Sequence, residues 1–151
     1  DENNINAITR AMEEDSLVMV CSTKPSKEGQ RDYDSLYDAG VVGSIMRKVA
    51  LPDGRVKILF QGLARAKTVF EVQSSPLIAH VEILKATNVN SPVLDAILEV
   101  VREKVKILSS ISGNFPPDLL RSIEDNHDYN RIIDLICSTL KIKKKIAYKI
   151  F

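Results

Sequence analysis

The sequence predicts an α+β fold in which a small, curled, barrel-like β-sheet with one helix precedes a lobe of helices. Three observations support this fold class. Several short segments between residues 41 and 84 alternate apolar and polar side chains with the period of a β-strand. Turns that contain Gly or Pro separate these segments. After Ser91 the apolar residues recur at helical spacing, so we expect one unit at residues 1–87 and another at residues 88–151.

The first unit should open with a helix and a short strand. Ile5, Ile8 and Met12 recur at helical spacing, and the apolar run at residues 17–21 reads as a strand. Residues 22–40 are polar and contain Pro and Gly, so we expect a loop. Loops of this length are uncommon unless they are functional or mobile.

A β-hairpin is expected around Pro52, Asp53 and Gly54. Proline presets the φ angle of a turn, an aspartate side chain bonds its own backbone, and glycine accepts positive φ. Gly62 should mark a bulge or a sharp bend in the strand that follows. The segments expected to be extended are residues 41–51, 55–62, 64–72 and 77–84.

The second unit should consist of one long helix and shorter ones. Ser91 can cap the long helix, with Pro92 at its first position. Shorter helices are expected at residues 118–123 and from Asp128 onward, and the segment "KIKKKIAYKIF" begins another. We expect one apolar stripe on the long helix, made of Val93, Leu94, Ile97, Leu98, Val101, Val105 and Leu108.

Composition indicates a globular chain with a real core. Hydrophobic residues make up 44% of the 151 residues and charged residues 27%. With a net charge of +1, the chain as a whole gives no support for electrostatic attraction to nucleic acid or to a membrane surface. The chain has no apolar run long enough for a membrane span, and its first ten residues lack the basic start and apolar core expected of a signal peptide. Two cysteines, Cys21 and Cys137, fit buried, reduced thiols in a cytoplasmic protein.

One stretch resembles a phosphate-binding loop in part. Gly62 is followed after four residues by Lys67 and Thr68, but Ala66 stands where the pattern requires a second glycine. The residues that follow have the composition of a strand, whereas a phosphate-binding loop opens a helix. We therefore expect no nucleotide site here.

The remaining polar residues suggest no catalytic, cofactor or metal site. His80 lies within a predicted strand and His127 in a polar turn, without a nucleophile that the sequence recommends for either. The carboxylates Glu124, Asp125 and Asp128 do not have the spacing of a calcium loop. Lysines near the end could contact nucleic acid, although the solvated side of an amphipathic helix explains them better. They are Lys141, Lys143, Lys144, Lys145 and Lys149.

The segment "DAGVVGSIMRKVALPDGRVKILFQGLARAKTVFEV", residues 38–72, resembles the N-terminal domain of bacterial Lon, the ATP-dependent protease. The preceding "AITRAMEEDSLVMV" is similar to the helix and second strand of that domain, and residues 116–151 are similar to its helical lobe. The matching positions are Gly40, Val42, Gly43, Ile45, Leu51-Pro52-Asp53-Gly54, Val56-Lys57-Ile58-Leu59-Phe60, Gly62-Leu63 and Arg65.

This resemblance implies a division of labour. The chain would be a non-catalytic fragment that recognises unfolded or tagged proteins and supports oligomer assembly. An ATPase with its ATP and Mg²⁺, a Ser-Lys peptidase and a hexameric arrangement would belong to the parent protein, outside these residues. The alternative is a free-standing adaptor or scaffold with the same domain and no protease.

The family pattern also begins with a strand that nothing before residue 1 supplies, so we expect a fragment with an open sheet edge, and its last helix cut short.

The candidate substrate-binding residues are Tyr33, Leu36 and Tyr37, near the end of the expected loop. Aromatic and leucine side chains on a mobile loop suit weak recognition of exposed apolar segments. Leu36 and Tyr37 could instead simply cap the barrel, because the family pattern places an apolar residue here before Gly40, and both interpretations stay open at this point.

Overall fold

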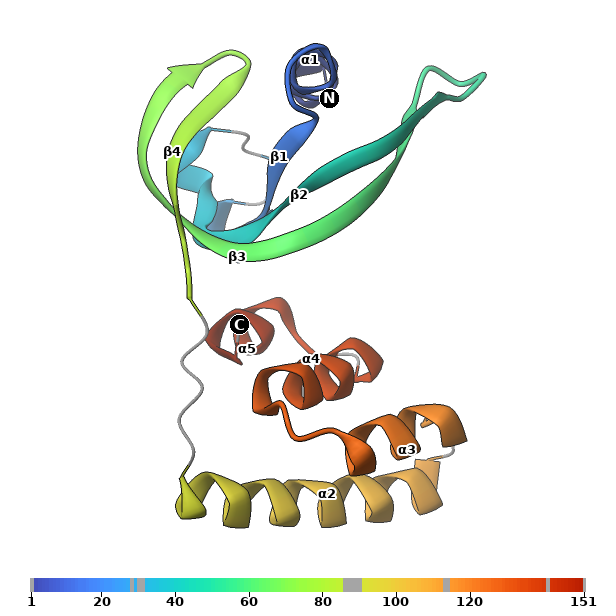
Figure 1. Ribbon diagram of the computed structural model, residues 1–151. Coiled ribbons are helices and arrows are strands. Elements are labelled where there is room, and N and C mark those ends of the chain that lie inside the picture. The colour runs from blue at the N-terminus through green and yellow to red at the C-terminus, as the bar shows by residue number, and fades with distance from the viewer. Residues whose placement is uncertain are drawn as a thin grey trace. The chain divides into compact units, whose positions relative to one another are not determined.

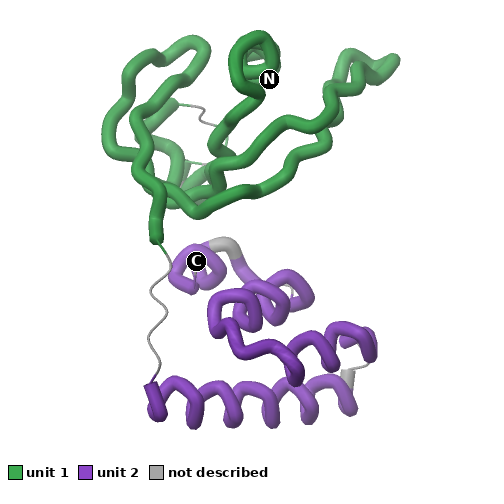
Figure 2. Tube along the Cα trace, in the orientation of Figure 1, with its two compact units in different colours: residues 1–85 green, residues 86–151 purple. Residues whose placement is uncertain are grey.

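The computed structural model describes residues 2–27, 29, 32–85, 91–112, 115–140 and 142–150. The chain divides into two compact units, residues 1–85 and 86–151 (Figure 2). The sequence predicts the boundary between the units after residue 87. That position is one of residues 86–90, which lie outside the described residues. Within the described residues, no helix is both long and apolar enough to cross a membrane.

The part of unit 1 that the structure describes forms a four-stranded antiparallel sheet with one α-helix. Its strands follow each other in the order β1-β2-β3-β4, and the long ribbons of β2 and β3 curl strongly (Figure 1). This arrangement, with the helices of unit 2, confirms the predicted α+β class. The elements are α1 (Glu2–Glu13), β1 (Leu17–Thr23), β2 (Leu36–Ala50), β3 (Val56–Ser74) and β4 (Leu77–Ile83).

The loop predicted at residues 22–40 is wrong at both ends. β1 continues to Thr23, and β2 already begins at Leu36, which lies opposite Thr23 in the sheet. Two short 3₁₀ turns, Pro25–Lys27 and Tyr33–Ser35, lie between these strands. Pairing between strands distant in sequence therefore overrides the polar composition that suggested a loop.

β3 is one continuous strand, but its regular pairing with β2 is interrupted beside Gly62, where the sequence predicts a bulge. Gly43 of β2 lies opposite Gly62, whereas Val42 lies opposite Ala64, so Leu63 is the extra residue of a bulge. A bulge bends the strand and increases its twist, which suits the strong curl of this sheet.

The β2–β3 turn has the geometry that its residues favour. Gly54 adopts φ +80°, and its N–H donates to the carbonyl of Leu51 at 3.0 Å. Asp53 accepts a hydrogen bond from the backbone N–H of Arg55 at 3.0 Å and pairs with the Arg55 guanidinium. That pairing holds the pKa of the exposed Asp53 carboxyl below its usual value.

Gly54→Val should destabilise unit 1 by about 1–3 kcal/mol, because a β-branched residue is strained at positive φ. A Cβ at this position would meet nothing within 4 Å, so the cost is backbone strain and not collision. Gly54→Asn is the control, since asparagine tolerates this conformation and should cost much less. Urea denaturation measures both, and equal midpoints for the Val and Asn variants would contradict the assignment.

Among its described residues, unit 2 contains four helices, which are α2 (Pro92–Ser112), α3 (Pro117–Asp125), α4 (Tyr129–Thr139) and α5 (Lys144–Ile150). Asp128 caps α4 as predicted, because its Oδ1 accepts from the backbone N–H groups of Asn130 and Arg131. The buried core consists of Leu98, Val105, Phe115, Ile123, Ile132 and Ile136.

The single apolar stripe predicted for α2 is wrong in part. Leu98 and Val105 are buried and Val101 packs beside them, as expected. Val93 and Ile97, however, are 67% and 53% exposed. The core of unit 2 therefore covers only part of the apolar side of α2.

Candidate functional site

The predicted trio Tyr33, Leu36 and Tyr37 does not form a single exposed group. Tyr33 belongs to the second 3₁₀ turn, whereas Leu36 and Tyr37 begin β2. All three side chains are half-buried. Strand pairing at Leu36 gives it a structural role that a loop residue would not have.

Tyr33 lines a depression of about 420 Å³ in unit 1. The wall combines the start of α1, the 3₁₀ turn and the end of the β3–β4 hairpin. The other lining residues are Asn3, Asp32, Glu71, Ser74 and Leu77. This wall is polar and acidic at Asp32 and Glu71, with apolar contributions from Tyr33 and Leu77.

Hydrogen bonds fix the turn that carries Tyr33. Asp32 accepts from the backbone N–H of Ser35 at 2.8 Å, and the fully buried Ser35 hydroxyl donates to the Asp32 carbonyl at 2.7 Å. The N–H of Lys24 donates to the Ser35 carbonyl at 2.8 Å. Ser75 reaches Asn3 of α1 through a hydroxyl bond of 2.7 Å. The depression therefore has a defined wall rather than a loose one.

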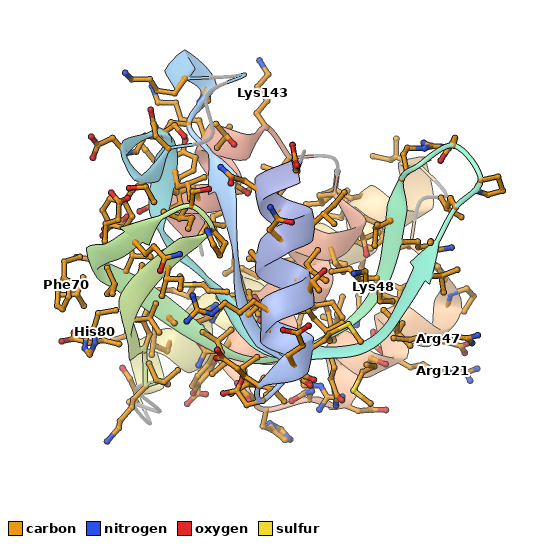
Figure 3. All side chains as sticks on the ribbon, turned by 90° about the horizontal axis from the view of Figure 1, so that it is seen from above. Arg47, Lys48, Phe70, His80, Arg121 and Lys143 are labelled. Carbon is orange, nitrogen blue, oxygen red and sulfur yellow. The ribbon has the colours of Figure 1, made fainter. Side chains whose placement is uncertain are left out.

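A second surface lies at the same end of the sheet, and the sequence reasoning missed it. The rings of Phe70 on β3 and His80 on β4 stack with centroids 5.1 Å apart and planes 5° from parallel. Both side chains lie side by side and point away from the ribbon (Figure 3). Phe70 remains 54% exposed despite this contact. We call the pair, with Val69 and Val72, the aromatic shelf.

The shelf owes its exposure to two irregularities of β3. The pairing of β3 with β4 shifts register between Thr68 and Phe70 and again between Glu71 and Gln73. Val69 and Val72 are the extra residues, and they are 46% and 62% exposed. A bulge re-aims side chains, so apolar residues on both sides of Phe70 reach solvent. The alternation of Phe70 and Val72 was visible in the sequence, but the bulges were not.

The stretch that resembled a phosphate-binding loop lies entirely within β3. Gly62, Ala66 and Lys67 are strand residues, and no helix begins after them. The Lys67 amine lies 3.4 Å from the Asp38 carboxylate. This geometry offers no helix N-terminus to a phosphate group.

The cysteine and histidine positions show no reactive arrangement. Burial, and secondly the negative charge of Asp38, raise the pKa of the Cys21 thiol, which disfavours the nucleophilic thiolate. His80 is occupied in the aromatic stack. Among the residues that the structure describes, no three His, Cys, Asp or Glu side chains gather as a metal site would require.

His127 lines a cavity of about 410 Å³ in unit 2, together with Asp95, Leu98, Glu99, Arg102 and Tyr129. The Tyr129 hydroxyl donates to Asp95 at 2.7 Å, and this bond raises the pKa of the phenol. Arg102 pairs with Glu99 and also donates to backbone carbonyls. These polar groups connect α2 to the segment that contains α3 and α4, so their role is structural.

For the terminal lysines the sequence favours the solvated side of an amphipathic helix over contact with nucleic acid. Lys143, Lys145 and Lys149 are exposed. Lys141 lies outside the described residues, as does the side chain of Lys144.

Comparison with known proteins gives consistent matches along the chain. A family model described as the ATP-dependent protease La (LON) substrate-binding domain matches residues 1–151. The Lon protease of Campylobacter jejuni is 48% identical over 152 residues, covering 100% of this chain and 19% of that protein. The Lon protease of Helicobacter pylori strain 26695 is 39% identical over 163 residues, covering 99% of this chain and 18% of that protein.

A solved structure, the N-terminal domain of a Mycobacterium avium complex Lon protease, shares the fold with a TM-score of 0.72. The matched region includes 99% of this chain and 76% of the Mycobacterium chain, and the sequence identity is 14%. The chain thus spans about 19% of the length of the Campylobacter relative.

Proposed function

Because this chain belongs to the family of Lon substrate-binding domains, we propose that it recognises unfolded or tagged polypeptides for an ATP-dependent protease and performs no chemistry itself. The parent protein would hold the ATPase with its ATP and Mg²⁺, and the Ser-Lys peptidase. It would also assemble as a hexamer, which the chain would support. A cytoplasmic location is part of the same proposal, and the low cysteine content favours it.

The observation that carries this proposal is the aromatic shelf. Unfolded proteins differ from folded ones chiefly in the apolar side chains that they expose to solvent. Phe70 and Val72 offer such chains an apolar surface that is already more than half open. An open surface of this kind gives weak and adaptable contacts, which suit a module that must accept many sequences.

We also propose Tyr33, Leu36 and Tyr37 as a second contact region, with the main role at Tyr33. The depression lined by Tyr33 also includes Glu71, the neighbour of Phe70 in β3. One extended polypeptide that passes over β3 could therefore contact both the aromatic shelf and the depression. The acidic side chains Asp32 and Glu71 would favour segments that combine basic and apolar residues.

The double variant Phe70→Ser, Val72→Ser should bind a permanently unfolded model protein about tenfold more weakly, because apolar contacts worth about 1.4 kcal/mol are lost. The melting temperature should change little, since both side chains are mostly exposed. Fluorescence anisotropy with a labelled, reduced and alkylated substrate measures the affinity. Leu59→Ser is the matched control, because Leu59 is 62% exposed on the other end of β3.

Tyr33→Ser tests the depression separately from the strand. Leu36→Ser and Tyr37→Ser alter half-buried residues of β2, so these variants should lower stability whatever their effect on binding. Unchanged affinity in the shelf variant and in Tyr33→Ser would reject both sites. A wild-type chain that fails to bind unfolded proteins would reject the proposed function.

A further inference from the structure

Helix α2 carries a second apolar row that its own unit leaves exposed. Its residues are separated by alternating steps of four and three, and we call the row the α2 seam. The seam comprises Val93, Ile97, Val100, Lys104, Ile107 and Ile111. Its five apolar members are 67%, 53%, 54%, 45% and 78% exposed in that order. Five exposed, large apolar side chains along one side of a helix mark an interaction surface.

The seam lies next to the side of α2 that faces the core. Leu98 and Val105 of that side are 8% and 4% exposed, with Val101 packed against them. With 3.6 residues per turn, the two sides together make about half of the helix circumference apolar. The opposite half carries polar residues such as Glu99 and Lys106. One core therefore explains only part of the apolar surface of α2.

The spacing specifies what can cover the seam. Steps of four and three give an average period of 3.5 residues, the pattern with which one α-helix packs along another in a coiled coil. An extended peptide has a period of two and would not match this row. The occupant should therefore be a helix of similar length with its own apolar row.

A second copy of α2 has the required complementarity. The order of steps, four-three-four-three-four, reads the same in both directions along the chain. In an antiparallel pair, Val93 would lie opposite Ile111 of the other copy. Each valine of the seam would then face a longer side chain, which alternates small and large residues across the contact.

The charges near the middle of the seam also fit a second copy. Lys104 interrupts the apolar row and would face Val100 of the other copy. Glu103, beside the seam, would lie within one turn of that valine, so its carboxylate is within reach of the lysine amine of the opposite chain. The two-fold symmetry makes this ion pair twice. A single lysine in such a row costs stability but selects one register.

We propose that the α2 seam is the surface through which two copies of this chain associate, as an antiparallel pair of α2 helices. The inference rests on the assembly role proposed above and gives that role a surface. The aromatic shelf lies on unit 1, so substrate binding and self-association can fail independently.

Sedimentation equilibrium of the full 151-residue chain tests the proposal. We expect a reversible monomer–dimer equilibrium, and Ile97→Glu should raise its dissociation constant by about 100-fold or more, because two unpaired charges enter the apolar contact. Ile133→Glu is the matched control, since Ile133 is 40% exposed on α4, outside the seam, and should leave the dimer unchanged. A wild-type chain that is monomeric throughout, or a dimer that persists in Ile97→Glu, would overturn the proposal.

A charge exchange identifies the partner as a second copy. Glu103→Lys or Lys104→Glu alone should weaken the dimer by about two- to tenfold, because like charges then meet across the contact. The double variant Glu103→Lys, Lys104→Glu should recover wild-type affinity, because both partners change together. Failure to recover would reject this register. A monomeric wild type whose unfolded-substrate binding is lost in Ile97→Glu would assign the seam to substrates instead.

Discussion

Replacement of Gly43 by alanine is expected to destabilise unit 1 by at least about 3 kcal/mol, at the upper end of the cost of overpacking. A Cβ on Gly43 would lie 2.2 Å from the backbone oxygen of Gln61 and 2.5 Å from a ring carbon of Phe60. The backbone atom cannot turn aside as a side chain can. The strands β2 and β3 would have to separate where they are paired.

Urea denaturation followed by amide NMR resolves the two units and measures this effect. The signals of unit 1 should lose their dispersion at lower urea, whereas those of unit 2 keep their midpoint. Gly62→Ala is the matched control, because its Cβ would meet two side-chain atoms, the Cγ1 atom of Val41 at 3.1 Å and a ring carbon of Phe60 at 4.0 Å, and the Val41 side chain can move. Equal midpoints for Gly43→Ala and Gly62→Ala would show that the sheet tolerates the additional methyl group.

Arg102→Leu is expected to destabilise unit 2 by about 2–4 kcal/mol, because it leaves two partly buried acceptors without their donor. The Arg102 guanidinium donates to the carbonyl of Ile123 at 3.1 Å and to that of Asn126 at 2.6 Å. These carbonyls lie at the end of α3, where helical groups lack partners within the helix. A positive charge is also favourable at this end of a helix.

The control for this variant is Arg121→Leu, which removes the same charge from an exposed position on α3. Its effect should stay within about 0.5 kcal/mol, as for most surface substitutions. Thermal and urea unfolding followed by circular dichroism compare the two variants. Similar losses for both would mean that general charge, rather than the contacts of Arg102, stabilises unit 2.

The candidate site was only partly predictable from the sequence. Tyr33, Leu36 and Tyr37 were identified as apolar residues near the end of a polar segment, but β2 includes two of them. The stacking of Phe70 on His80 depends on the register between β3 and β4, and two bulges set that register. Neither bulge has a local signal comparable to a Pro-Asp-Gly turn, so the shelf was not visible in advance.

The sequence by itself determined the features that depend on neighbouring residues. Gly54 at positive φ, Asp128 as the cap of α4 and Pro92 at the start of α2 all follow from local backbone chemistry. The change from strand period to helix period likewise predicted the α+β class. Such preferences act within a few residues, and the surrounding fold did not reverse them here.

Only the tertiary structure decided which apolar and charged residues are buried. Val93 and Leu98 both belong to the apolar half of α2, yet the first is 67% exposed and the second 8%. In the sequence Phe115 belongs to a segment that interrupts the helices, but in the structure it lies in the core. Arg102 lies on the polar side of α2, yet it donates a hydrogen bond to a carbonyl of α3. Burial depends on which surfaces meet, and residues distant in sequence supply those surfaces.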